Sequence, residues 1–290
     1  MSLESSQGSD EKKAPGLLTR WFRYLRFLLA IRGGTDVNGT IEEICENVKL
    51  RGANTWLLIC SALLASIGLD VNSTAVIIGA MLISPLMSPI LGVGLGVAIL
   101  DRQLLKRSVG SLGIATLVSL LTSFIYFLIS PFAEMTSELS ARTTPTILDI
   151  GVAFFGGMAG VVAGSRMRKT NAIPGVAIAT ALMPPVCTAG FGLATGDWTT
   201  FLGSFYLFFI NAFFISLATY LIAVWLKFPK KARLNEEQGV RVRQSVIAFA
   251  VIVTIPSGLI MWGVLDRLKT ERGIRNLINA EFRKDDRQAF

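Results

Sequence analysis

The stretch GAMLISPLMSPILGVGLGVAILD, residues 79–101, decides the fold of this chain. It is apolar and carries no charge before Asp101. About 20 apolar residues are enough for a helix to cross the ~30 Å hydrocarbon core of a bilayer. Proline removes a backbone N–H and clashes with the preceding turn, so Pro85 and Pro89 predict a break near residues 84–89. In lipid, a broken helix persists only where protein or water satisfies the freed backbone groups, so the break is a candidate site.

The same pattern occurs again 96 residues further along the chain. Residues 175–197 read GVAIATALMPPVCTAGFGLATGD and align with residues 79–101 without a gap. A proline, two spaced glycines and the closing aspartate coincide in the two stretches. Apolar segments match easily by chance, but this combination of residues does not. The sequence therefore predicts an internal repeat.

The composition is that of a multi-pass membrane protein. Of the 290 residues, 52% are hydrophobic, and the mean hydropathy is +0.56. The net charge of +8 reflects Lys and Arg beside the apolar spans, as in membrane flanks, so we expect no nucleic-acid partner. Histidine is absent, which removes the imidazole ligand, general base and proton relay. Cys45, Cys60 and Cys187 have neither close pairing nor metal-site spacing and are predicted to be free thiols.

Two short helices are predicted before the spans. Residues 17–32 alternate arginines with aromatic residues and leucines, which is typical of a helix in the lipid headgroup region. Residues 40–49 form a second helix, for which Thr40 and Glu43 are expected to make a capping box.

Seven apolar spans follow these helices. They are predicted near residues 54–69, 73–100, 108–130, 146–165, 171–195, 200–226 and 244–265. Basic and non-basic connections alternate between them, which places the N-terminus in the cytoplasm. Seven full crossings put the basic tail, residues 266–290, outside; a last span that re-enters the membrane is the alternative.

The topology predicts the relation between the halves. Each half has three spans, an odd number, so the second enters the membrane inverted, as in many transporters. The fold class is therefore all-α and polytopic, with two inverted three-span repeats, broken helices and a seventh transmembrane helix. The predicted regions are a cytoplasmic region with the interfacial helix (1–50), the first repeat (51–130), the second repeat (146–227), and the seventh span with its basic tail (228–290).

The two breaks are predicted to form one site at the membrane midplane. Ser88 and Pro89 are expected to be the N-cap and first residue of a new half-helix, and Pro184 and Pro185 occupy the matching place. A helix N-terminus offers free N–H groups and about half a positive charge, which suits a small anion or a polar solute. The alternative is that the prolines only kink two packed helices. The predicted substrate-binding residues are Ser84, Pro85, Met87, Ser88, Pro89, Thr180, Met183, Pro184, Pro185, Thr188 and Asn211.

Aspartates near the span ends are the next candidates. Asp149 is expected to be more buried than Asp70, Asp101 or Asp197, and it follows Asn211 as a place to look if the breaks only pack. Asp101 and Asp197 are expected to lie at opposite membrane faces. No GxSxG, HExxH or P-loop motif is present, so we expect no enzyme, no cofactor and no metal site.

The quoted motifs also resemble a known family. GAMLISPLMSPILGVGLG (79–96), ALMPPVCTAGFGLATGDW (181–198) and the basic turn between spans are similar to the domain-of-unknown-function 389 family of polytopic membrane proteins in prokaryotes and plants. The likeness covers about residues 50–230. It implies an integral membrane protein and no assigned substrate. Some members carry a longer C-terminal soluble region than this chain.

Together these features predict a transport protein, either a secondary carrier or a channel. The expected location is the cell membrane, the inner membrane if the source is bacterial. The expected partners are the lipid bilayer, a small anion or polar solute, and further copies of the chain in a homo-oligomer. The alternative function is a non-transporting membrane scaffold or sensor that docks partners through its two terminal regions.

Overall fold

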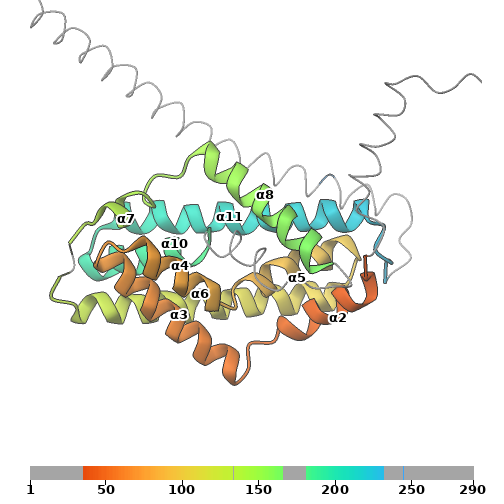
Figure 1. Cartoon of the computed structure of the whole chain (residues 1–290), viewed down its shortest axis with the longest axis horizontal. Helices are drawn as coiled ribbons and strands as arrows, with labels where there is room; N and C mark the ends of the chain where they lie inside the picture. Colours follow the sequence, from red (N-terminus) through yellow and green to blue (C-terminus); the bar gives the residue numbers. More distant parts are fainter. Residues whose placement is uncertain (1–34, 133, 166–180, 232–243, 245–290) are drawn as a thin grey trace, which may run out of the picture. The chain divides into compact units, whose positions relative to one another are not determined.

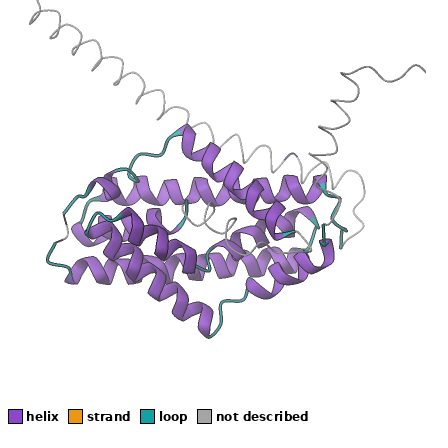
Figure 2. Cartoon of the chain, viewed as in Figure 1, coloured by secondary structure: helices purple, strands orange, loops and turns teal. Residues whose placement is uncertain are grey.

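The computed structural model describes residues 35–132, 134–165, 181–231 and 244. The elements in these ranges are helices, which confirms the all-α class for the described chain (Figure 2). The chain divides into two compact units, Met1–Thr35 and Asp36–Phe290, and all the helices below belong to the second. The predicted helix at 17–32 and, apart from residue 244, the seventh span lie outside the described residues.

The helices follow one another in the order drawn in Figure 1. They are α2 (Val37–Asn47), α3 (Ala53–Asp70), α4 (Thr74–Ile83), α5 (Met87–Ala98), α6 (Arg102–Ile129), α7 (Ser137–Ser140), α8 (Ile147–Gly164), α10 (Met183–Thr195) and α11 (Trp198–Trp225).

Three of these helices are long and apolar enough to cross a membrane, namely α3, α6 and α11. A fourth span results if α4 and α5, which meet at 54°, are counted as one bent helix. α8 is apolar over Leu148–Gly164 but shorter. The described residues thus contain three or four candidate spans, which is consistent with a membrane protein. The full set of seven stays a prediction.

The distribution of side chains on α6 is the reverse of that on a soluble helix. Its outer face exposes large apolar residues at helical spacing, namely Ile114, Leu117, Leu121, Ile125 and Leu128. Its buried face carries small or hydroxyl side chains, namely Ser108, Ala115, Ser119 and Ser123. Small residues let helix backbones approach closely in lipid, where apolar side chains gain nothing by turning inward. The α6 pattern is therefore that of a helix surrounded by lipid.

The first break lies within the predicted range 84–89, but the helix after it begins two residues earlier than expected. Ser84 ends α4 in an extended conformation, as the residue before a proline prefers, and Pro85 and Leu86 separate the two helices. α5 begins at Met87, so the expectation that Ser88 caps a helix starting at Pro89 is wrong. Pro89 sits in the first turn, where a helix tolerates proline because that N–H has no partner there.

The second half of the described chain repeats helix lengths of the first. α6 and α11 each contain 28 residues and begin 96 positions apart, at Arg102 and Trp198. α5 and α10 also begin 96 positions apart, at Met87 and Met183. α3 and α8 each contain 18 residues. This is the spacing that the sequence repeat predicts.

Equivalent aspartates cap the two long helices. The Asp101 carboxylate accepts hydrogen bonds from the N–H groups of Gln103 and Leu104 at the start of α6. The Asp197 carboxylate accepts from the equivalent N–H groups at the start of α11. Both side chains therefore act as N-caps, which satisfy backbone donors that a helix start leaves free.

Glycines set the distance between each half-helix and the long helices. A Cβ atom on Gly94 of α5 would overlap the carbonyl oxygen of Ser216 on α11. A Cβ atom on Gly190 of α10, 96 positions later, would lie 2.7 Å from the Ser123 Cβ on α6. Each half-helix thus packs against the long helix of the opposite half through an equivalent glycine.

Helix α2 differs from its expected start. It begins at Val37 with Asp36 as its N-cap, whose carboxylate accepts from the Gly39 N–H at 2.9 Å. Thr40 instead donates its hydroxyl to the backbone oxygen of Asp36. The predicted capping box of Thr40 and Glu43 is therefore wrong.

We predict that Gly94→Ala and Gly190→Ala each destabilise the protein by about 1–3 kcal/mol, because both overpack a close helix contact. The measurement is thermal unfolding of the detergent-solubilised chain. Gly110→Ala is the matched control, since nothing lies within 4 Å of a Cβ there and alanine favours a helix. Equal melting temperatures for all three variants would contradict the proposed close packing.

Candidate functional site

The residue before α10 and the first turn of α5 both contact the central part of α11. Asn211, midway along this helix, donates its Nδ2 to the backbone oxygen of Ala181, just before α10, at 2.7 Å. Ser216 lies 3.1 Å from the backbone oxygen of Ile90, in the first turn of α5. α11 therefore supplies a side-chain donor to the residue just before α10, whereas the Ser216 hydroxyl is shared between Ile90 and the Ala212 oxygen of its own helix, 2.9 Å away.

The first turn of α10 has further polar support from the opposite side. The hydroxyl of Ser123 on α6 donates to the backbone oxygen of Cys187 at 2.8 Å. The hydroxyl of Ser66 on α3 lies 2.9 Å from that of Ser123. These groups are buried, so the bonds form where unpaired polar groups are most costly.

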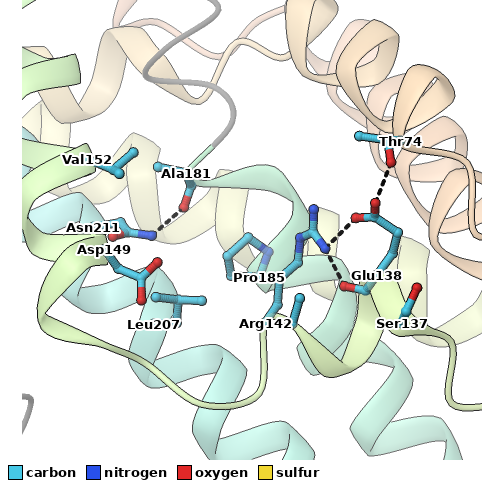
Figure 3. Close-up of a pocket in the computed structure, with 11 residues that line it drawn as sticks. Thr74, Ser137, Glu138, Arg142, Asp149, Val152, Ala181, Pro185, Leu207 and Asn211 are labelled. Atoms are coloured by element: carbon cyan, nitrogen blue, oxygen red, sulfur yellow. Dashed lines mark hydrogen bonds and ion pairs between the residues drawn. The ribbon is translucent and has the colours of Figure 1, made fainter. Parts of the chain in front are cut away.

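A polar cavity of about 420 Å³ opens beside the second break (Figure 3). Its lining combines residues from α4, α7, α8, α11 and the start of α10. They are Thr74, Ser137, Glu138, Ala141, Arg142, Asp149, Val152, Ala181, Pro185, Leu207 and Asn211. In the view of Figure 3, Asp149 and Asn211 are drawn on one side of Pro185, and the side chains of Glu138 and Arg142 on the other. This cavity is the candidate site.

One wall of the cavity contains an ion pair between Glu138 of α7 and Arg142, which follows this helix. Arg142 and Glu138 approach to 2.7 Å at i,i+4 spacing, and Arg142 also donates to the backbone oxygen of Glu138. The Thr74 hydroxyl at the start of α4 donates to the Glu138 carboxylate. This bond, opposed by partial burial and reinforced by Arg142, holds the pKa of Glu138 below its usual value of 4.5. The pair thus links α7 to α4.

The opposite wall carries Asp149, in the first turn of α8. Its Oδ2 accepts from the backbone N–H and the hydroxyl of Thr146, each at 2.7 Å, as half of a capping box. The side chain is half-buried, whereas Asp70 and Asp101 are buried. The expectation that Asp149 is the most buried of the four aspartates is therefore wrong. The Asp149 carboxylate nevertheless lines the cavity and brings a charged group to it.

Of the eleven predicted site residues, two line the cavity, eight do not, and one lies outside the described residues. Pro185 and Asn211 line the cavity. The residues that do not line it are Ser84, Pro85, Met87, Ser88, Pro89, Met183, Pro184 and Thr188. Thr180 lies outside the described residues. The sequence therefore located one break of the site but not its walls.

The loop before α8 lines part of the cavity, and the sequence did not predict this role. Ser137, Glu138 and Arg142 line the cavity, and the sequence analysis used this loop only as a topology signal. The i,i+4 spacing of Glu138 and Arg142 is typical of an ion pair on one helix face and was the available signal. Nothing in the sequence placed α7 against the start of α10.

The two half-helix starts differ in the backbone donors that they offer. The first three residues of α5 are Met87, Ser88 and Pro89, of which two have an N–H group. In α10 they are Met183, Pro184 and Pro185, of which only Met183 has one. The prediction of two equivalent anion-binding helix ends therefore does not apply to α10.

The described residues form an all-helical structure with lipid-type helix surfaces and a polar cavity beside the start of α10. Residues 81–217 match the family described as "Domain of unknown function (DUF389)". This match confirms the resemblance drawn from the sequence over these residues.

A relative is found among the curated proteins. An uncharacterized protein of Methanocaldococcus jannaschii is 27% identical over 174 residues, which are 60% of this chain and 54% of the relative. The match thus spans about half of the length of that relative. No solved structure gives a significant match.

We predict that Asn211→Ala destabilises the protein by about 1–3 kcal/mol, because it leaves the buried oxygen of Ala181 without its donor. Asn54→Ala is the matched control, since Asn54 also donates to a backbone oxygen but at an exposed position, 3.4 Å from Lys49. Unfolding in detergent measures both. A loss at Asn211 no larger than at Asn54 would show that the bond does not hold the break.

We predict that the Glu138 carboxylate makes the free energy of unfolding depend on pH in the acidic range. Its pKa is lowered in the folded chain, so its contribution is present above 4.5 and is lost as the pH falls through the folded value. Glu138→Gln should lower stability at neutral pH by no more than about 1 kcal/mol and flatten the acid dependence of the melting temperature. Glu134→Gln, in the same loop and exposed, should keep the parental profile. A parental profile in Glu138→Gln would refute the assignment.

Proposed function

We propose that this chain is a membrane transport protein, a secondary carrier or a channel, which passes a small anion or polar solute through a site at the two helix breaks. The observation that carries the proposal is the Asn211 side chain in the middle of α11, which holds the residue before α10 and lines a polar cavity at that place. Interrupted helices that meet near the centre of a long apolar helix are the usual construction of a transporter site.

The proposal includes an inverted repeat. Its support is the equal length of α6 and α11, their equivalent aspartate caps, and the contact of each half-helix with the long helix of the opposite half. In Figure 1 the colours of α6 and α11 progress along the chain in opposite directions, as inverted halves require. We further propose seven spans, a cytoplasmic N-terminus in the cell membrane, and assembly as a homo-oligomer.

Solute flux into proteoliposomes tests the transport function. Swelling of vesicles that contain the full chain should exceed that of empty vesicles for at least one small solute in a panel of acetate, acetamide and propylammonium salts. A scaffold or sensor would give the rate of empty vesicles with every solute, and that outcome would refute transport.

Pro85→Ala tests the role of the first break. Alanine restores the N–H and lets Ser84 adopt helical angles, so α4 and α5 can join. We expect flux to fall while the amount of folded protein stays at the parental level. Pro131→Ala, at an exposed position after α6, should keep the parental flux. A folded Pro85→Ala variant that transports at the parental rate would show that the bend is only a packing feature.

A further inference from the structure

The charges on the cavity wall do not balance. Three charged side chains line the cavity, Glu138, Arg142 and Asp149. Glu138 and Arg142 neutralise one another at 2.7 Å. Asp149 has no cationic partner among the described residues, and its Oδ2 accepts both of the hydrogen bonds from Thr146. The described wall therefore presents one uncompensated negative charge to whatever enters.

A second acceptor belongs to another residue of the same cavity lining. Asn211 lines the cavity and is 3% exposed. Because the Ala181 oxygen can only accept a hydrogen bond, the Nδ2 of Asn211 must face it. The Oδ1 of Asn211 therefore points away from the Ala181 oxygen. This Oδ1 is buried and has no hydrogen-bond partner among the described groups. An unpaired buried acceptor is costly and is explained where a ligand supplies the donor.

The donors that an anion needs are scarce at the same place. Proline occupies the second and third positions of α10, so Met183 is the only one of the first three residues with an N–H group. Arg142, the cation of the described wall, is already bound to Glu138. A free anion would therefore meet the Asp149 charge without an available counter-charge.

We infer that the cavity binds a monovalent cationic group through the Asp149 carboxylate and the Asn211 Oδ1, and that it rejects free anions. This inference rests on the proposed function and narrows its solute to one that carries a cation. The group is either the ammonium of a small solute or an alkali cation that accompanies the solute, since both take oxygen ligands. Asp149 supplies the charge from the rigid first turn of α8, and Asn211 supplies the neutral oxygen from α11.

The test is ligand-dependent thermal stability of the detergent-solubilised full chain. A ligand that binds only the folded state raises the melting temperature with its concentration. Propylammonium chloride, sodium acetate and acetamide are probes of similar size that differ in charge, and sodium and potassium chloride separate the two cation sources. We expect the melting temperature to rise to a plateau with propylammonium chloride, or with only one of the two alkali chlorides. Acetamide should not raise it, and sodium acetate should raise it no more than sodium chloride does.

Asp149→Asn should weaken the cation effect at least tenfold, because asparagine can keep the cap on Thr146 but loses the charge. Asp197→Asn is the matched control, as it removes a helix-capping carboxylate that does not line the cavity, and should keep the parental response. Asn211→Leu should also weaken the response.

A rise with acetate that sodium chloride does not reproduce, no rise with any cation, or an unchanged response in Asp149→Asn would overturn the inference. These melting temperatures are measured independently of solute flux. Cation binding without transport would leave the inference standing and refute the proposed function, whereas acetate flux without cation binding would do the reverse.

Discussion

A chain that interrupts a helix in an apolar environment must find partners for the backbone groups that the break releases. Here Asn211 of α11 donates to the oxygen of Ala181, just before α10, and Ser61 of α3 donates to the oxygen of Ala80, near the end of α4. The start of α10 is therefore held against α11, and the end of α4 against α3. Ser216 of α11 also lies 3.1 Å from the oxygen of Ile90, and glycine is needed where α5 touches α11.

The same requirement explains why polar side chains lie inside. Ser66 and Ser123 extend the polar support to α3 and α6, while large apolar residues occupy the outer face of α6. In water this distribution would expose apolar surface at a large cost. In lipid it costs little, because the hydroxyls meet backbone oxygens and the apolar residues meet hydrocarbon. The interior thus holds polar groups that a site can use.

Much of the fold could be predicted from the sequence because it depends on local chemistry. Apolar length predicted α3, α6 and α11, proline predicted the bend after Ser84, and the gapless repeat predicted the 96-residue spacing. The register of the break was wrong because the conformational restriction acts on the residue before Pro85, not at Pro89. The cavity could be predicted only in part, since its α7 wall depends on a loop contact between Thr74 and Glu138 that no periodicity encodes.

The repeat that we propose would offer two equivalent places for a site, and the residues differ between them. The position equivalent to Asn211, 96 residues earlier, is Ala115, which is buried and has no side-chain donor. Counted from the first residue of each helix, the position in α3 that corresponds to Asp149 in α8 is Thr55, whose side chain is uncharged. The first break therefore lacks both groups that face the cavity at the second. If the two halves exchange conformations during transport, the solute contacts at Asp149 and Asn211 stay with the second half, and the first half contributes the bend at Pro85 as a moving part.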